Sequence, residues 1–173
     1  MALKLFVEKL WNGDPCPEPN VHSVFTVRST REGLLVRAQG NLASPARVPD
    51  APRGARVNGL WNFDVLELFL VGTNKHYLEL ELGAGGHYLI LSFDAVRHCS
   101  NEHSDTLLDV HYEQHSETSW VSEVTIPWDV LPKKIHAMNA YMVVEPYYLA
   151  MHPVPGNKPD FHQPDAFPWA MIT

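Results

Sequence analysis

The sequence predicts an all-β fold, an antiparallel β-sandwich of jelly-roll-like form, and three observations lead to this prediction. Between Leu60 and Phe93, three segments alternate apolar and other side chains with a period of two, which is typical of half-buried strands. Turn-forming residues recur between short apolar segments along the whole chain. No segment shows helical periodicity over more than two turns. Because 173 residues with 45% hydrophobic side chains suffice for one core, we expect a single domain over residues 1–173.

The N-terminal part is expected to form three strands and one long loop. Alternation predicts strands over residues 3–7, 21–28 and 33–39, and a turn over residues 12–15 ends the first of them. Residues 41–59 form a loop rich in proline, alanine and arginine. Loops of this length are uncommon in compact domains and are often functional.

The central stretch is expected to hold three successive strands, over residues 65–70, 77–82 and 88–93. A three-residue loop, 72–74, joins the first pair. A two-residue turn at Gly85-Gly86 joins the second, because glycine tolerates positive φ at both turn positions. This register turns nine apolar side chains toward the opposite sheet: Leu66, Leu68, Leu70, Leu78, Leu80, Leu82, Leu89, Leu91 and Phe93.

The other face of these strands is acidic. The same register places Glu67 directly opposite Glu79, with Tyr77 next to this pair along its strand. Like charges directly opposite each other are destabilising, so we expect water, a basic side chain, a metal ion or the hydroxyls of a ligand to offset them. Arg28 or Arg37 is the expected basic partner, provided that their strands join this sheet.

The C-terminal part is expected to add further strands. Alternation predicts them over residues 108–112 and 120–126, with a longer one within 138–149. Residues 128–131 are compatible with one helical turn, which Pro132 ends. The remaining tail is expected to form a loop followed by a short closing strand.

Charge and composition argue against several classes of protein. The formal net charge of −7 argues against nucleic-acid binding. The sequence has no run of 18 apolar residues, so no membrane span is expected. Residues 1–11 carry Glu8 within an apolar run too short for a signal peptide. Cys16 and Cys99 alone make no disulfide framework, and we expect a cytoplasmic protein with free thiols.

Several motifs together resemble one known family. The strands LWNFDVLELFL (60–70) and YLELELGAGG (77–86), the strand WVSEVTIPWDVL (120–131) and the segment FHQPDAFPWAMI (161–172) follow, in order and spacing, the pattern of the family 9 carbohydrate-binding modules. The segment HPVPGNKPDFH (152–162) is also similar to a family of uncharacterised eukaryotic proteins with the same expected sandwich.

This resemblance implies a β-sandwich that binds sugar without catalysis. In the family, two aromatic side chains enclose a sugar ring and a glutamate accepts hydrogen bonds from its hydroxyls; Trp61 and Glu67 match the first aromatic residue and that glutamate. Where the family has a second tryptophan, the best candidate in this chain is Tyr148. We therefore expect a non-catalytic binding domain for a small polar ligand, such as a carbohydrate, with no cofactor. Its expected ligand-binding residues are Trp61, Glu67, Tyr77, Glu79 and Tyr148.

Histidines and methionines leave two alternatives of the same fold open. Residues 98–105 combine histidine, cysteine and carboxylate groups in a spacing that matches no closed zinc site, and His111, Glu113 and His115 would share one strand face; we expect both groups to be solvated. A haem- or metal-binding redox module would need axial ligands from the C-terminal strands. The candidates are Met138, Met142, Met151, His152 and His162. A further alternative is a protein-interaction domain without a small ligand.

The sequence gives little support for an enzyme. It contains no G-x-S-x-G elbow, no glycine-rich phosphate loop and no H-E-x-x-H motif. Glu67 and Glu79 are the one pair suited to glycosidase chemistry, which requires two carboxyl groups on either side of a bound sugar. We do not expect them to act in this way.

Overall fold

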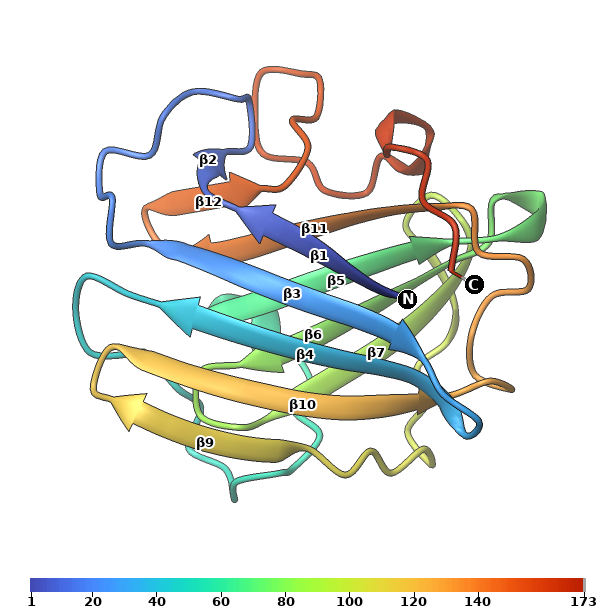
Figure 1. Ribbon diagram of the computed structural model, residues 1–173, viewed down its shortest axis with the longest axis horizontal. Helices are drawn as coiled ribbons and strands as arrows, with labels where there is room; N and C mark the ends of the chain where they lie inside the picture. The colour runs from blue at the N-terminus through green and yellow to red at the C-terminus, as the bar shows by residue number, and fades with distance from the viewer. Residues whose placement is uncertain (173) are drawn as a thin grey trace.

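Two antiparallel β-sheets face each other in the computed structural model, which describes residues 1–172 (Figure 1). The five-stranded sheet has the order β1-β3-β4-β10-β9 and lies toward the viewer in Figure 1. Its strands are β1 (Ala2–Val7), β3 (His22–Ser29), β4 (Gly33–Asn41), β10 (Ser119–Pro127) and β9 (His111–Ser116).

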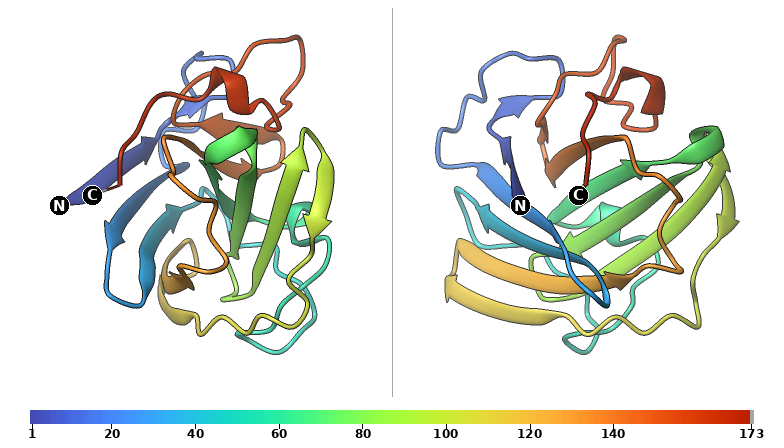
Figure 2. Two further views of the ribbon diagram at one scale, coloured as in Figure 1. Left: turned by 90° about the vertical axis from the view of Figure 1, so that its right-hand side faces the viewer. Right: turned by 45° about the vertical axis from the view of Figure 1, so that its right-hand side comes forward.

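The seven-stranded sheet has the order β2-β12-β11-β5-β6-β7-β8 and forms the second layer (Figure 2). Its strands are β2 (Lys9–Leu10), β12 (Tyr147–Ala150), β11 (Ala137–Val144), β5 (Val65–Val71), β6 (Tyr77–Gly83), β7 (Tyr88–Ala95) and β8 (His98–Asn101). The helical elements within residues 1–172 are three 3₁₀ helices: η1 (Leu60–Asn62), η2 (Thr73–Lys75) and η3 (Pro164–Ala166). None of them is long and apolar enough to span a bilayer. The predicted all-β antiparallel sandwich is confirmed.

The main core lies between the two sheets and is built by alternate residues of each strand. On the seven-stranded sheet, six predicted core leucines are fully buried there: Leu66, Leu68, Leu70, Leu78, Leu80 and Leu82. On the five-stranded sheet, Phe25, Val36 and Ile126 face them within the same cluster. Removing one leucine side chain of this kind from water contributes about 1.5–3 kcal/mol, so this face accounts for much of the stability of the fold.

The prediction that Leu89, Leu91 and Phe93 share this core is wrong. The loop between β6 and β7 has three residues, Ala84 to Gly86, and not the predicted two-residue turn: the N–H of Gly83 donates to the carbonyl of His87 at 2.9 Å. Gly86 has a φ of +90°, the left-handed conformation that closes a three-residue hairpin loop. The extra loop residue shifts the pairing by one position, and the three side chains of β7 therefore turn to the opposite face.

The first hairpin has a three-residue loop, as expected, but one position later, at η2. Leu68 consequently pairs with Leu80, and Glu67 lies opposite Glu81 instead of Glu79. The leucines keep their face because the shift in pairing is two residues.

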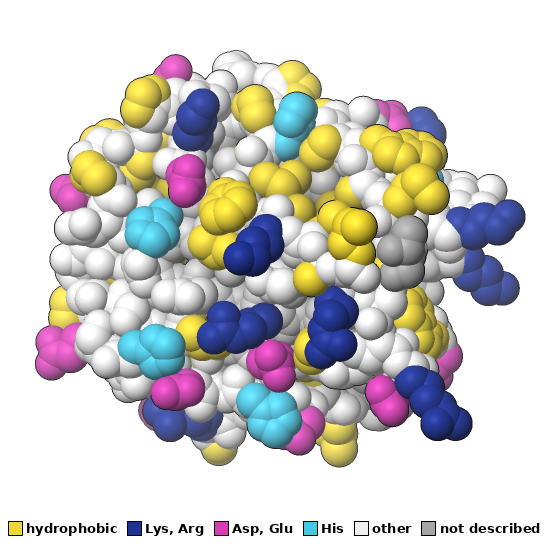
Figure 3. All heavy atoms as spheres, viewed as in Figure 1, with side chains coloured by type: hydrophobic (Ala, Val, Ile, Leu, Met, Phe, Trp, Pro, Cys, Tyr) yellow, Lys and Arg dark blue, Asp and Glu magenta, His cyan; other side chains and the backbone are white. Residues whose placement is uncertain are grey.

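The predicted arginine partners are also wrong. Arg28 lies in β3 and Arg37 in β4, and both residues are exposed on the other sheet. Figure 3 shows the outer surface of that five-stranded sheet, where basic, acidic and histidine side chains are interspersed. Neither arginine can therefore neutralise the glutamates on the far side of the sandwich.

Several predicted boundaries change in the C-terminal half. The strand expected over residues 108–112 is β9, which begins at His111, and the strand expected within 138–149 is the hairpin of β11 and β12. Residues 128–131 form turns without a helix. The expected closing strand is reduced to one bridge between Ala137 and Trp169, and the short strands β2 and β8 were not predicted.

A second apolar cluster covers the outer face of the seven-stranded sheet. Alternate residues of β5, β6, β7 and β11 point there and pack against the segment that follows β12. Aromatic rings dominate the contacts: Phe69 meets Tyr141 edge-on with centroids 5.3 Å apart, and Phe167 at 5.9 Å. The seven-stranded sheet is therefore buried on both faces, in the middle of a three-layer arrangement of sheet, sheet and loop.

Candidate functional site

A pocket of about 740 Å³ opens on the outer face of the seven-stranded sheet. Its floor comes from β5, β6 and β7 and includes Glu67, Glu79 and Leu91. Its walls come from η1, from the β7–β8 and β11–β12 turns, and from the segment after β12. The pocket therefore brings together residues that are distant in sequence, and the pairing of the strands positions the residues of its floor.

Trp61 stands at one wall because of the short helix η1. Gly59 precedes this helix with a φ of +72°, and Leu60 is fully buried in the outer cluster. Anchored by Leu60, the helix turns the next side chain outward, so that Trp61 lines the pocket with 49% of its surface exposed. The indole is thus available to a ligand before any ligand binds.

Three glutamates lie together, and two of them, Glu67 and Glu79, form part of the pocket floor. Glu67 of β5 pairs with Glu81 of β6, and Glu79 lies two residues along β6 on the same face. One carboxylate oxygen of each lies within 4.8 Å of the other two, and the side chains are 3%, 0% and 5% exposed for Glu67, Glu81 and Glu79. Within residues 1–172, no lysine or arginine forms an ion pair with them, and neither oxygen of Glu81 has a hydrogen-bond donor.

Burial raises the pKa of all three carboxyl groups. Desolvation is the main cause for Glu67, with the charge of Glu79 adding to it. Desolvation also raises the pKa of Glu81, followed by the charges of Glu67 and Glu79. For Glu79, desolvation raises the pKa to about 7, although the positive charge of Arg97 opposes this shift. Burial thus favours the protonated form of these carboxyl groups.

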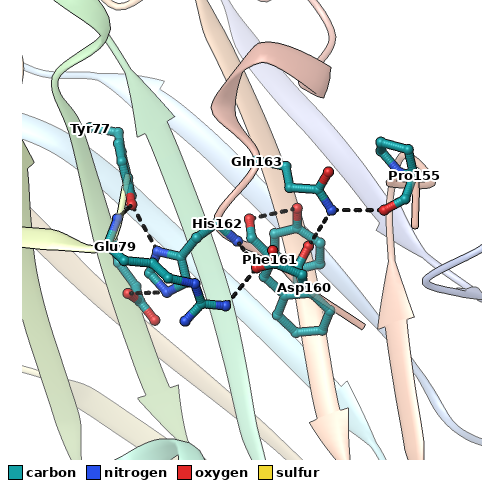
Figure 4. Close-up of polar contacts among 9 residues, drawn as sticks. Tyr77, Glu79, Pro155, Asp160, Phe161, His162 and Gln163 are labelled. Carbon is teal, nitrogen blue, oxygen red and sulfur yellow. Dashed lines mark hydrogen bonds and ion pairs between the residues drawn. The ribbon is translucent and has the colours of Figure 1, made fainter. Parts of the chain in front are cut away.

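A chain of polar contacts runs from the sheet to the C-terminal segment (Figure 4). The hydroxyl of Tyr77 lies 2.8 Å from Nδ1 of His162 and accepts the backbone N–H of Arg97 at 3.0 Å. The other ring nitrogen of His162, Nε2, lies 3.7 Å from Oε2 of Glu79. Desolvation lowers the pKa of His162 to about 4, so the imidazole is neutral at pH 7. Tyr77 is therefore a support beneath the pocket and orients His162.

Aromatic and ionic contacts hold the wall that carries His162. Phe161 stacks on Tyr141 with centroids 3.9 Å apart, and the Tyr141 hydroxyl donates to the Phe161 carbonyl at 3.2 Å. The carboxylate of Asp160 accepts a hydrogen bond of 2.6 Å from the Arg97 guanidinium. The side chain of Gln163 donates to the carbonyls of Pro155 and Asp160, at 2.9 and 2.8 Å, and so links three positions within the segment that follows β12 (Figure 4).

The structure brings four of the five predicted site residues to this one pocket. Trp61, Glu67, Glu79 and Tyr148 line it, whereas Tyr77 is 1% exposed and lies behind His162. The ring of Tyr148 lies 6.4 Å from that of Phe161. The predicted rim, residues 41–59, contributes only Asn58.

Sequence reasoning missed Glu81, Arg97 and Phe161 as site residues and considered His162 only as a haem ligand. The signal for Phe161 and His162 was present, since both open the motif FHQPDAFPWAMI that carries the family resemblance. The motif does not indicate that this segment packs against β6, so the position of His162 next to Glu79 could not be predicted from it.

The alternative metal and haem ligands are not gathered in the same way. His98 pairs with Asp94, and Nε2 of His103 lies 2.7 Å from the Ser92 hydroxyl. Met138 and Met142 are fully buried between the sheets, on the face of β11 opposite the pocket. His111, Glu113 and His115 are exposed on β9 of the other sheet.

Comparisons with known proteins agree with the expected family resemblance. No family model matches the chain. The UPF0462 protein C4orf33 homolog of Mus musculus is 28% identical over 93% of this chain and 87% of its own length. The homolog of Danio rerio is 25% identical over 95% and 87%, and the human UPF0462 protein C4orf33 is 25% identical over 90% and 81%. The predicted resemblance to uncharacterised eukaryotic proteins is confirmed.

A solved structure shares the fold. It is the crystal structure of a candidate carbohydrate-binding protein from Bacteroides uniformis, with a TM-score of 0.78, 16% identity, and coverage of 99% of this chain and 86% of that chain. At this identity the likeness concerns the fold, and it confirms the predicted carbohydrate-binding-like sandwich. The chain is thus similar in sequence to the UPF0462 proteins, and it shares its β-sandwich fold with the Bacteroides uniformis protein.

Proposed function

We propose that this chain is a non-catalytic binding domain for a small carbohydrate, with the pocket on the seven-stranded sheet as its site. The observation that carries the proposal is the half-exposed indole of Trp61 in the same pocket as the carboxylates of Glu67 and Glu79. A pyranose presents an apolar C–H face and a ring of hydroxyls. An indole stacks on the first, and carboxylates accept hydrogen bonds from the second.

The size and lining of the pocket suit this class of ligand. Small-molecule sites usually enclose about 300–1,000 Å³, and this pocket has about 740 Å³. Tyr148 and Phe161 supply further aromatic surface, and Asn58, Asn62 and Arg97 supply donors that complement the carboxylates. The fold shared with a candidate carbohydrate-binding protein supports the same assignment.

Calorimetry against a panel of mono- and disaccharides tests the proposal. We expect one binding event per chain, accompanied by a change in tryptophan fluorescence. Trp61→Ala should abolish it, and Glu67→Gln should weaken it roughly 10- to 100-fold, because a hydrogen bond to a charged group contributes about 1.5–3 kcal/mol.

Trp169→Ala is the matched control, since Trp169 is 72% exposed and lies outside the pocket. Binding that survives Trp61→Ala unchanged, or the absence of any binding at millimolar sugar, would contradict the proposal.

We also propose that residues 1–173 act as one domain in the cytoplasm. Cys16 and Cys99 are both free thiols, as suits a reducing compartment. Fractionation of cells that express a tagged protein tests the compartment, and limited proteolysis to one resistant core tests the domain.

A further inference from the structure

The three glutamates of this cluster lack a positively charged partner. Glu67, Glu79 and Glu81 are each at least 95% buried, and the nearest guanidinium, that of Arg97, is engaged by Asp160 at 2.6 Å. A buried carboxyl group keeps its charge only where it is paired or coordinates a metal. Glu81 is the extreme case, because it is 0% exposed and no donor reaches either of its carboxylate oxygens.

We propose that Glu67, Glu79 and Glu81 bind one hard divalent cation, of the Ca²⁺ or Mn²⁺ kind, beneath the carbohydrate pocket. Carboxylate oxygens are the preferred ligands of such ions. Two oxygens on opposite sides of a Ca²⁺ ion, each about 2.3–2.6 Å from it, are at most about 5 Å apart. The three carboxylate oxygens lie within 4.8 Å of one another, so one ion reaches all three.

His162 lies next to the proposed ion. Its Nε2 lies 3.7 Å from the Glu79 carboxylate, while its Nδ1 is held by the Tyr77 hydroxyl at 2.8 Å. Histidines that bind metals are characteristically oriented by a second residue at the other ring nitrogen. Tyr77 holds His162 in this way, so the ring lies beside the proposed ion, whose ligands are the carboxylate oxygens.

A sugar cannot take the place of this ion. Glu81 does not line the pocket and is 0% exposed, so a hydroxyl in the pocket does not reach its carboxylate. An ion among the three carboxylates meets Glu81 directly. The cation site therefore goes beyond the proposed sugar site, although the two share Glu67 and Glu79.

Ion binding is tested on the whole chain, stripped with EDTA, dialysed, and titrated with CaCl₂, MnCl₂ or MgCl₂ in the absence of sugar. We expect one ion per chain by calorimetry and elemental analysis. At an ion concentration 100 times Kd, the Tm should rise by about 5–10 °C. Glu81→Gln should abolish both effects, whereas Glu113→Gln, which changes an exposed carboxylate of β9, should retain them.

Two results would overturn the site: no stoichiometric ion with any of the three salts, or a Glu81→Gln protein that binds the ion as the wild type does. If Glu81→Gln fails to fold, paramagnetic Mn²⁺ with the wild type replaces it. The ring resonances of His162 should then broaden at stoichiometric Mn²⁺ while those of His111 and His115 stay sharp, and equal or absent broadening would overturn the site. Sugar binding without ion binding would refute this site alone, and ion binding without sugar binding would refute the proposed function alone.

Discussion

The two faces of the seven-stranded sheet are built from alternate residues of the same strands, yet they contribute to stability in opposite ways. The inner face presents leucines to the other sheet and holds the sandwich together. The outer face combines a smaller aromatic cluster with three buried carboxylates. Leu80 and Glu81 are neighbours in β6 and both are 0% exposed. Leu80 lies on the inner face and Glu81 on the outer face, so the pair exemplifies the difference.

The difference shows which residues stabilise the folded state and which residues destabilise it. Burial of apolar surface favours the folded state at every inner position, whereas burial of an unpaired carboxylate opposes it. The aromatic contacts around Phe69 and Tyr141 offset that opposition on the outer face. The cost of these buried carboxylates is consistent with the binding role proposed for them.

The inner face should show the largest change in stability. Leu80→Ala removes a fully buried side chain and leaves a cavity in the close-packed core. We expect the free energy of unfolding to fall by about 2–5 kcal/mol, measured by urea denaturation. A loss below 1 kcal/mol would mean that the inner face is not the main source of stability.

The outer face should respond in the opposite direction. Glu81→Gln keeps the shape of the side chain and removes an ionisable group whose pKa burial raises and whose oxygens have no donor. In EDTA at pH 8 we expect the free energy of unfolding to rise by about 1–3 kcal/mol, in the same urea assay. A loss of stability instead would show that the Glu81 carboxylate is paired in the ion-free protein.

A matched pair of tyrosines sharpens the comparison further. The hydroxyl of Tyr77 bonds His162 and the N–H of Arg97 on the outer face; that of Tyr88 donates to the Thr106 carbonyl and accepts the N–H of Leu108 on the inner face. Tyr77→Phe and Tyr88→Phe should each lower the free energy of unfolding by about 1–2 kcal/mol. Only Tyr77→Phe should alter ligand or ion binding in calorimetry, and an equal effect of both on binding would contradict the role of His162.

An exposed acid at the end of β7 should show the smallest effect. A hydrogen bond from His98 lowers the pKa of Asp94, in contrast to the raised pKa of the buried glutamates. Its small contribution to stability is present above the pKa of the unfolded chain and is lost as the pH falls through the lower, folded value. NMR titration should find the Asp94 pKa below its ordinary value and restored in His98→Ala; an unshifted wild-type pKa would refute the contact.

The strands of both faces could be predicted from alternation, but the face of β7 could not. Leu89, Leu91 and Phe93 alternate as well in one register as in the other. The choice depends on whether Ala84 belongs to the strand or to the loop, and a Gly-Gly pair permits both. Gly86 is the residue that decides it, because it alone takes the left-handed conformation in that loop.

The site could be predicted in part, for a similar reason. Trp61, Glu67 and Glu79 lie on or just before predicted strands, so local pattern and family resemblance were enough to select them. Arg97, Phe161 and His162 reach the pocket through tertiary packing of irregular segments. Such packing leaves no period in the sequence, and the polar cluster of Glu67, Glu79 and Glu81 likewise depends on a register that the turns determine.

The segment that carries His162 is synthesised well after the strands that it covers. His162 lies 85 residues after Tyr77, its partner, and a ribosome adds residues at about 5–20 per second. Roughly 4–17 s therefore pass between the synthesis of the acidic strands and that of the segment that encloses them. During that interval the glutamates are hydrated, so the proposed ion would have access to them before the segment that carries His162 packs over them.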